Sequence, residues 1–399
     1  MLRILISALL SYLLGSISPS YILGRILKGI DIREHGDGNA GTVNTYHILG
    51  LFPAIITAIF DLSKGLISFY ISSRFLNLEG FLLSIPIVFS VLGHIFPFYL
   101  NFRGGQGAGT STGFLLYFLA IQISRGFFPI ESLIVLSLLV LISAYVARKG
   151  EFVGIFILPV FLFLNIYFGR GSINSFYISL VTIYLIGLQL RNIIRYKFYE
   201  LKEKKDVRWW RVALRPLAML FVIIDFYYGN KNSLILIGIV AMFFLFTDIS
   251  RLAHRKVEKF MFSDLKYIFK KSEEGKFSSM TLFLLASFAI FLIFPRDISY
   301  LAFTFLVFGD LLSKIYGMRF GRIKLVGERT LEGTLSYFMG SLSSGYILSL
   351  LIGIDIKILI IGSILASLTE LVSIGIDDNF GVGIISGIGM SAFRYFKII

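Results

Sequence analysis

The chain has 399 residues, of which 56% are hydrophobic and only 16% charged, and its mean hydropathy is +0.82. Because a soluble domain carries about 25% charged residues, this composition excludes an ordinary soluble protein and predicts an integral membrane protein. The formal net charge is +14, but the basic residues lie in short loops between apolar runs, which argues against nucleic-acid binding and for membrane lipids as partners. With no Cys and four His, the chain has no disulfides, thiolate metal sites or cysteine nucleophiles, and a His-rich metal centre is not expected.

Apolar runs of about 15 to 22 residues recur along the chain, close to the roughly 20 residues that a spanning helix needs. We therefore expect an all-α, polytopic helical membrane protein with about 14 transmembrane helices in two bundles of seven. The first run continues through Leu23 into a basic loop without a cleavage site, so we interpret it as a span and not as a signal peptide. The predicted spans are residues 4–23, 51–72, 82–100, 110–123, 131–147, 152–168, 174–190, 212–228, 233–249, 280–294, 298–317, 335–353, 356–375 and 380–395.

Lys and Arg are concentrated in the loops on one side of these spans, which predicts that those loops face the cytoplasm and that the N-terminus faces outward. The expected location is the inner (plasma) membrane of the cell, crossed many times, with active sites on the cytoplasmic face. The charged stretch 196–215 separates the two bundles, so we predict domains at 1–205 and 206–399. A second basic stretch, 251–276, is expected to form a surface segment such as an amphipathic helix.

Two glycine-rich polar stretches interrupt the apolar runs of the first half, HGDGNAGTVN at 35–44 and FRGGQGAGTSTG at 102–113. Backbone amides freed by glycine next to a helix start can form a nest for an anion, so we expect a phosphate-handling site at the membrane surface. Neither stretch is a nucleotide motif, because the first follows no strand and the second lacks the Walker lysine. The expected phosphate-binding residues are Arg33, Gly36, Gly38, Gly41, Arg103, Gly104, Gly105, Gly107 and Thr110, with Asn39 and Asn44 as neutral hydrogen-bonding groups.

Two opposite charges lie three residues apart on one face of the second predicted span, in the motif DLSKG. Charged groups inside a span are costly unless they are paired or solvated. Asp61 and Lys64 therefore belong either to the site or to an ion pair that braces the bundle, and both interpretations stay open.

Taken in order, the motifs of the first half resemble the acyl-phosphate:glycerol-3-phosphate acyltransferases of the PlsY type. The resemblance covers residues 1 to about 202 and rests on GSISPSYILGRILKGIDIREHGDGNAGTVNTYHILG, DLSKG, GHIFPFYLNFRGGQGAGTSTG and LQLRNIIR. It implies acyl transfer from acyl phosphate to glycerol 3-phosphate, by a bundle whose motifs lie on the cytoplasmic side. It also implies Asn39, Asn44 and Asn192 as catalytic residues, and it adds Ser16 and Arg195 to the substrate-binding set.

Several positions depart from the family pattern. Asp37 and Gln106 stand where the family has a phosphate-binding Ser and Lys, and Leu188 and Gln189 replace Arg and His. An added anion and a lost cation both disfavour a bound phosphate, since one charge-assisted hydrogen bond contributes about 1.5–3 kcal/mol. Two alternatives therefore stay open: an acyltransferase, with the same or a different donor or acceptor, or a non-catalytic lipid-phosphate-binding module that serves the second half.

In the last third of the chain, sparse acidic residues lie at span ends beside Arg and Lys. Asp310 lies late in one predicted inward-heading span, Glu370 closes another, and Asp377 and Asp378 begin the loop that follows it. Our topology brings all of them to the cytoplasmic face. Carboxylates beside cations are what binding of a Mg²⁺-nucleotide needs, because oxygen ligands hold the metal and the cations meet the phosphates.

These pieces resemble the CTP-dependent lipid kinases of the dolichol and phytol kinase type, which are related to phosphatidate cytidylyltransferases. The resemblance rests on GDLLSKIYGMRFGRIKL, RTLEGT, the late Glu370 and DDNFGV, and it is clearest over 305–390. It implies Mg²⁺ as cofactor, held by Asp310, Asp377 and Asp378, and CTP as co-substrate. It also implies Asp310, Glu370 and Asp378 as catalytic residues and Arg322, Lys324 and Arg329 as the cations that meet the triphosphate, with Glu332 in the same substrate-binding site.

The sequence thus predicts a two-part phospholipid-biosynthesis enzyme whose partners are membrane lipids, acyl phosphate, glycerol 3-phosphate and a nucleoside triphosphate. The first half would form lysophosphatidate, and the second would phosphorylate a prenol or diacylglycerol. A transporter is a further alternative, supported only by intramembrane charges such as Asp225 and Asp248. The phosphorylated lipid, the choice between CTP and ATP and the oligomeric state stay open at this point.

Overall fold

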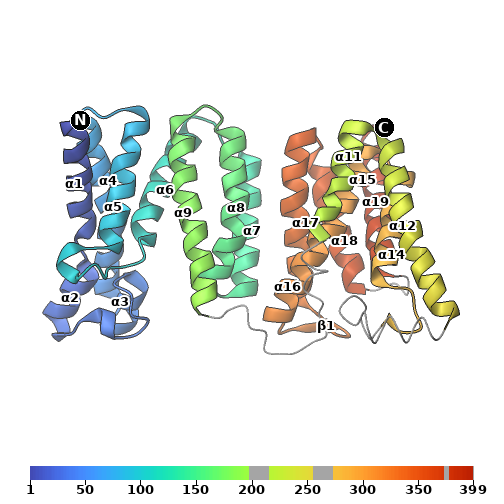
Figure 1. Ribbon diagram of the computed structural model, residues 1–399, viewed down its shortest axis with the longest axis horizontal. Coiled ribbons are helices and arrows are strands. Elements are labelled where there is room, and N and C mark those ends of the chain that lie inside the picture. The colour runs from blue at the N-terminus through green and yellow to red at the C-terminus, as the bar shows by residue number, and fades with distance from the viewer. Residues whose placement is uncertain (197–214, 255–272, 373–376, 399) are drawn as a thin grey trace. The chain divides into compact units, whose positions relative to one another are not determined.

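The computed structural model describes residues 1–196, 215–254, 273–372 and 377–398, and these residues are almost entirely helical (Figure 1). The chain divides into two compact units, one made of Met1–Leu136 and Gly154–Lys197 and the other of Ser137–Val153 and Phe198–Ile399. The domain boundary predicted at 205/206 and most of the basic stretch 251–276 lie outside the described residues. The prediction of an all-α, polytopic membrane protein is confirmed.

The first half of the chain consists of helices joined by short turns. In chain order these are α1 (Leu2–Ser16), α2 (Pro19–Lys28), η1 (Ile32–Glu34), α3 (Thr42–Leu49), α4 (Leu51–Arg74), η2 (Gly80–Leu83), α5 (Ser84–Ile95), η3 (Phe98–Leu100), α6 (Ala108–Ser124), α7 (Ile130–Ala147), α8 (Gly150–Phe168) and α9 (Ile173–Arg195).

The second half adds one small hairpin to its helices. Its elements are η4 (Arg215–Met219), α11 (Leu220–Tyr228), α12 (Asn230–Ala253), α14 (Ser279–Ile293), α15 (Arg296–Thr304), the π-helical turn η6 (Phe305–Gly309), α16 (Asp310–Phe320), β1 (Lys324–Val326), β2 (Arg329–Thr330), α17 (Leu331–Ile352), α18 (Ile356–Val372) and α19 (Asp378–Ile398). The strands β1 and β2 pair antiparallel, with Lys324 opposite Thr330.

Each predicted span overlaps a helix of the structure. Nine of the described helical segments are long and apolar enough to cross a membrane, and two further apolar helices, Ala108–Ser124 and Ser279–Ile293, are shorter. The count of about 14 transmembrane helices stays a prediction. The first predicted span, 4–23, is divided, because Ser18 caps the N-terminus of α2 by accepting a hydrogen bond from the Tyr21 amide and Pro19 occupies the first helical position.

Small residues let two helices of the first unit approach closely. A Cβ atom on Gly15 of α1 would lie 2.1 Å from the Ser90 carbonyl oxygen of α5, and one on Gly93 would lie 2.1 Å from the Tyr12 carbonyl oxygen. Only glycine fits such a crossing, because any side chain would meet backbone. The contact holds the end of α1, and therefore the start of α2, against the end of α5.

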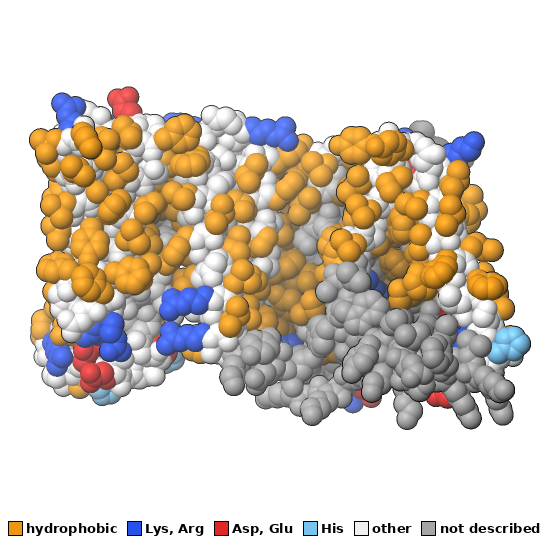
Figure 2. Space-filling model, in the orientation of Figure 1, with side chains coloured by type: hydrophobic (Ala, Val, Ile, Leu, Met, Phe, Trp, Pro, Cys, Tyr) orange, Lys and Arg blue, Asp and Glu red, His pale blue; other side chains and the backbone are white. Residues whose placement is uncertain are grey.

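Hydrophobic side chains cover the middle of the helices on the face shown in Figure 2, and charged side chains gather near their ends. Large apolar residues such as Leu9, Ile59 and Phe243 are about 60% exposed or more, as expected for side chains that face lipid. Inside the first unit, Phe69, Phe118 and Tyr177 pack ring against ring. The lipid-facing surface and the aromatic core leave the helix ends as the places for polar chemistry.

Candidate functional site

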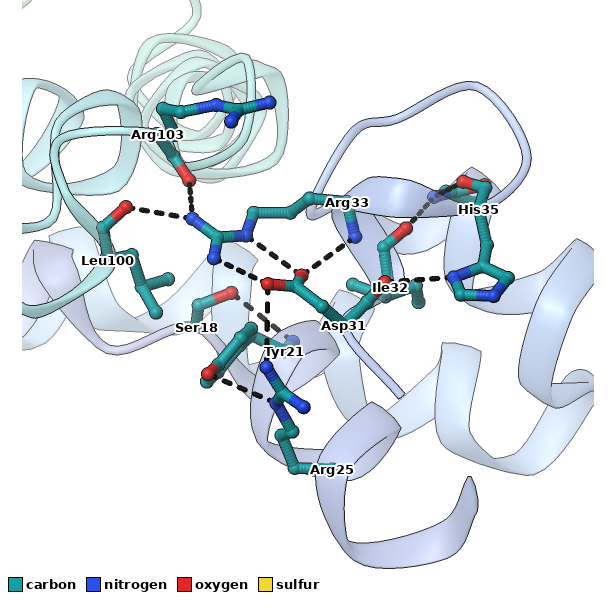
Figure 3. Close-up of polar contacts among 10 residues, drawn as sticks. Ser18, Tyr21, Arg25, Asp31, Ile32, Arg33, His35, Leu100 and Arg103 are labelled. Carbon is teal, nitrogen blue, oxygen red and sulfur yellow. Dashed lines mark hydrogen bonds and ion pairs between the residues drawn. The ribbon is translucent and has the colours of Figure 1, made fainter. Parts of the chain in front are cut away.

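Arg33 joins the two glycine-rich stretches of the first unit (Figure 3). Its guanidinium donates to both carboxylate oxygens of Asp31, at 2.9 and 2.6 Å, and to the carbonyl oxygens of Leu100 and Arg103 at 2.8 and 2.9 Å. These hydrogen bonds hold the pKa of the Asp31 carboxyl below its usual range. In this structure the Arg33 guanidinium ties the loop after α2 to the loop after η3. The phosphate-binding role predicted for Arg33 is not tested by this geometry and stays a prediction.

Asn44 is the internal partner of the first stretch. Its amide nitrogen donates to the carbonyl oxygens of Ile32, His35 and Asn39, each at 3.0 Å, and its side-chain oxygen accepts from the Asp37 amide at 3.2 Å. The side chain is 1% exposed. Asn44 therefore shapes the loop from within, and the catalytic role predicted for it is not tested by this geometry.

The glycine amides of both stretches have protein partners. The amides of Gly38 and Gly41 donate to the carbonyl oxygens of His35 and Asn39. Those of Gly104 and Gly105 donate to Ile95 and His94 at the end of α5. The expected anion nest is therefore not formed by these four amides, because short-range turns and the packing of the loop on α5 use their donors. Gly36 has φ +64°, and a Cβ there would lie 2.1 Å from the Asn44 side-chain oxygen.

The C-terminal end of α9 meets the second stretch at Gln106. The Asn192 side chain donates to the Gln106 side-chain oxygen at 3.0 Å, and the Tyr184 hydroxyl donates to the Gln106 carbonyl. Asn192 is 7% exposed, and within the described residues its own side-chain oxygen is buried without a hydrogen-bond partner. A buried acceptor of this kind needs an explanation, and a ligand that donates a hydrogen bond is one.

A buried polar cluster lies behind the second stretch. Asp61 pairs with Lys64 at 2.8 Å and lies 3.5 Å from a ring nitrogen of His94, which in turn lies 3.4 Å from the Thr110 hydroxyl. Lys64 also donates to the Ile17 carbonyl, in the break between α1 and α2, at 3.0 Å. All four side chains are 6% exposed or less. The structure thus favours the bracing interpretation of Asp61 and Lys64.

The remaining predicted residues of the first unit are scattered around this centre. Ser16 is buried, and its hydroxyl donates to the Tyr12 carbonyl. Gly107 caps the start of α6 with φ +71°. Arg103 and Arg195 are exposed, and the Arg195 guanidinium lies 5.7 Å from the Tyr196 ring.

The second unit contains a cavity of about 410 Å³ lined by α16, the β1–β2 hairpin, the start of α17 and the end of α18. It brings together three residues predicted from the sequence, Lys324, Arg329 and Glu370, and adds the unpredicted cations Lys314 and Arg319. Lys314 lies one helical turn after Asp310, so the spacing of these opposite charges was a usable signal that the sequence interpretation missed. Tyr184 of the first unit, whose hydroxyl donates to the Gln106 carbonyl, lies within the predicted span 174–190. Nothing in the sequence around it marked it as a site residue.

The predicted metal ligands do not come together. Asp310 pairs with Lys314 at 2.6 Å and with Arg215, Asp378 pairs with Arg329 at 2.7 Å, and Asp377 accepts from the Asn379 side chain at 2.8 Å. Across residues 1–196, 215–254, 273–372 and 377–398, no group of three or more His, Asp and Glu is placed to hold a metal ion. Asp310 and Asp378 are each bound to cations and Asp377 accepts from a neutral amide, so in this geometry the three carboxylates do not form the expected Mg²⁺ site. Mg²⁺ as a cofactor stays a prediction.

The Glu332 carboxylate is hydrogen-bonded to the protein itself. Its carboxylate accepts from the Arg322 side chain at 3.0 Å and from the backbone amides of Arg322 and Ile323 at 2.9 and 3.2 Å. The side chain is fully buried. Glu332 and Arg322 therefore fasten the segment before β1 to the start of α17, and their predicted contact with a triphosphate stays a prediction.

The fold and the first site together define a class: a polytopic membrane protein with a preformed polar site at the ends of its helices. A family model described as glycerol-3-phosphate acyltransferase matches residues 5–198. The glycerol-3-phosphate acyltransferase of Prochlorococcus marinus (strain MIT 9515) is 34% identical over 191 residues, which are 48% of this chain and 91% of that protein. That of Halalkalibacterium halodurans is 41% identical over 106 residues, 26% of this chain and only 52% of that protein.

Among solved structures, PlsY (YgiH), described as an integral membrane glycerol 3-phosphate acyltransferase, in its glycerol 3-phosphate form, is 27% identical. The match covers 49% of this chain and 92% of that one, with a TM-score of 0.38. Through its first half, the chain belongs to the glycerol-3-phosphate acyltransferase family. The resemblance of the first half to this family is confirmed, whereas the family match ends at residue 198 and leaves the kinase-like resemblance of the second half untested.

Proposed function

We propose that the first half transfers an acyl group from acyl phosphate to glycerol 3-phosphate at the cytoplasmic face of the inner membrane, and so forms lysophosphatidate. Membership of the glycerol-3-phosphate acyltransferase family supports the acceptor. The donor follows from the PlsY-type motifs of the sequence. In the reaction, the acceptor hydroxyl oxygen bonds to the acyl carbon, the bond from that carbon to the phosphate oxygen breaks, and the hydroxyl proton leaves with the released phosphate.

The observation that carries this proposal is the buried, unpartnered side-chain oxygen of Asn192 within the described residues. A hydroxyl of the acceptor would supply the missing donor. The neighbouring Gln106, held by Asn192 and Tyr184, is neutral, so the phosphate must find its cations elsewhere in the site. Arg103, an exposed residue of the second stretch, is the cation that we assign to the phosphate.

The test is acyl transfer by the purified full-length protein in micelles, followed as lysophosphatidate formed from acyl phosphate and glycerol 3-phosphate. Asn192→Ala should lower kcat/KM about 10- to 100-fold, the loss expected for one hydrogen bond to a buried group. Asn230→Ala is the matched control, because Asn230 of the other unit also has a buried side-chain oxygen that no described residue pairs with. No transfer by the unaltered protein, or equal losses in the two variants, would contradict the proposal.

The alternative is that the first half binds lipid phosphate without catalysis. Asp37 and Gln106 favour it, since neither helps to hold a dianion. Gln106→Lys combined with Asp37→Ser and Gln189→His separates the two proposals. Transfer that appears only in the altered protein supports the non-catalytic module, and robust transfer by the natural chain eliminates it.

A second candidate function, for the second half, is CTP-dependent phosphorylation of a prenol or diacylglycerol. The cationic cavity of about 410 Å³ favours it, because its size suits a nucleotide or a lipid headgroup. Labelled CTP and ATP, offered with a membrane lipid extract, identify both the nucleotide and the lipid that becomes phosphorylated. Absence of any labelled lipid over polyprenols and diacylglycerol would eliminate this candidate.

A further inference from the structure

The cavity of the second unit has an unusual distribution of charge. Among the described residues, four cations line it, Lys314, Arg319, Lys324 and Arg329, together with two carboxylates, Glu328 and Glu370. With all six groups in their ionised forms, this described lining carries an excess of two positive charges. Arg215 adds one cation, and Asp310 and Asp378 add two anions, which leaves an excess of one.

Carboxylates hold two of the lining cations in place. The Asp310 carboxylate pairs with the Lys314 ammonium, one turn further along α16, at 2.6 Å. The Asp378 carboxylate, at the start of α19, pairs with the Arg329 guanidinium of β2 at 2.7 Å. Both carboxylates are thus bound to cations of the cavity wall rather than assembled around a common centre. An ion pair of this kind fixes the direction of a long side chain that would otherwise sample many rotamers.

The start of α17 adds further positive character. Thr330 caps this 22-residue helix by accepting from the Gly333 amide at 3.2 Å, and Gly333 and Thr334 both line the cavity. The Gly333 amide is used by this cap, so the helix start favours an anion through the positive end of its dipole. Cations and helix start therefore favour the same kind of ligand.

We propose that this cavity binds a phosphate monoester directly, through Lys314, Arg329 and the start of α17, without a divalent cation. A monoester carries about −1.5 to −2 charges at neutral pH, which is close to the excess of two positive charges on the lining itself. A triphosphate carries more negative charge than this, so the kinase candidate would need a metal ion that the described carboxylates are not arranged to hold. The monoester and the nucleotide are therefore alternative occupants of the cavity, which the titrations below separate. The inference concerns the second half alone and does not depend on acyl transfer by the first.

Binding is measured by isothermal titration of the full-length protein in micelles, with octyl phosphate as the lipid-like probe and inorganic phosphate as the water-soluble one. Each titration is made in Mg²⁺ and in excess EDTA. We expect octyl phosphate to bind equally well in both. Tighter binding of octyl phosphate indicates a lipid headgroup as the natural ligand, and equal binding indicates a free phosphate compound.

Variants locate the site and separate it from the first half. Arg329→Gln should weaken binding tenfold or more, and Asp378→Asn should weaken it by a smaller factor that is the same with Mg²⁺ and with EDTA. Arg394→Gln is the matched control, since Arg394 is paired with Asp297 near the other end of α19. Asn192→Ala should leave this binding unchanged while it lowers acyl transfer.

The opposite results would overturn the proposal. Binding that needs Mg²⁺, or that Asp378→Asn weakens only when Mg²⁺ is present, would make the carboxylate a metal ligand. Binding of CTP with Mg²⁺, but of neither phosphate probe, would identify the cavity as a nucleotide-binding site. Binding of neither phosphate probe, or binding unaffected by Arg329→Gln, would also refute it, whatever the outcome of the acyl-transfer assay.

Discussion

The polar residues of the two units are used in different ways. In the first unit, Arg33, Asn44 and Lys64 spend their hydrogen bonds on the protein itself and are largely buried. In the second unit, Lys324 and Arg329 line a cavity. The comparison teaches that a charge conspicuous in a membrane sequence can be scaffold or binding group, and that its partners decide which. Substitutions at Arg33, Asn44 and Lys64 should therefore cost stability. Substitutions at Lys324 and Arg329 should cost ligand binding.

The largest effect is expected where a buried ion pair is broken. Lys64→Met leaves Asp61 charged and buried and also removes the donor to the Ile17 carbonyl, so we expect a loss of about 3–5 kcal/mol in the free energy of unfolding. Thermal unfolding in micelles measures it. The double variant Asp61→Asn with Lys64→Met should recover part of the loss. A double variant less stable than Lys64→Met alone would show that the pair is not the reason.

Asn44→Ala comes next. It removes one donor from each of three carbonyl oxygens that keep a backbone donor, and it removes the side-chain acceptor of the Asp37 amide, which we expect to cost about 3 kcal/mol and to abolish acyl transfer. Asn232→Ala serves as control, because exposed Asn232 donates a single bond, to the Tyr228 carbonyl. If Asn44→Ala lost activity at full stability, Asn44 would be a group that acts on the substrate and not part of the scaffold.

Gly15→Ala tests the helix crossing that supports the first site. A methyl group there meets the Ser90 carbonyl, so α1 and α5 must separate, at an expected cost of about 1–3 kcal/mol. Gly187→Ala is the matched control, since nothing lies within 4 Å of a Cβ at that helical position. It should stabilise α9 by about 0.5–1 kcal/mol. Both changes are read from thermal unfolding, and equal effects of the two would refute the packing argument.

How much was predictable depended on the range of the interaction. The helices followed from apolar runs, and even the break at Ser18–Pro19 had a local signal in a capping residue followed by proline. The partners of Arg33 at Leu100 and Arg103 lie 67 and 70 residues away, and no local pattern announces them. The same holds for the use of the Gly104 and Gly105 amides by the end of α5. The motifs therefore indicated where the candidate sites lie. They did not show which polar groups of those sites already have partners within the protein.

Asp31 gives the comparison a dependence on pH. Its pKa is lower in the folded protein than its usual value of about 3.9, so its pair with Arg33 stabilises the fold above that value and the contribution disappears as the pH falls through the lowered pKa. Asp31→Asn should cost about 1.5 kcal/mol at pH 7. The difference in Tm between the two proteins should be constant from pH 7 to about pH 5 and shrink below about pH 4. A constant difference down to the lowest pH would exclude the ion pair as its source.

The smallest effect is expected at the cavity, and it sharpens the comparison most directly. Lys324→Gln removes the same charge as Lys64→Met, but Lys324 and its partner Glu328 are 70% and 79% exposed and 3.9 Å apart. Such a pair contributes little to stability, so the free energy of unfolding should change by less than about 0.5 kcal/mol. If the cavity binds a phosphate monoester, the same variant should weaken binding of octyl phosphate measurably, because a lining cation is lost. A large loss of stability would instead show that Lys324 is a scaffold residue like Lys64. The distinction between scaffold and binding charges would then fail at a lysine that is 70% exposed to solvent.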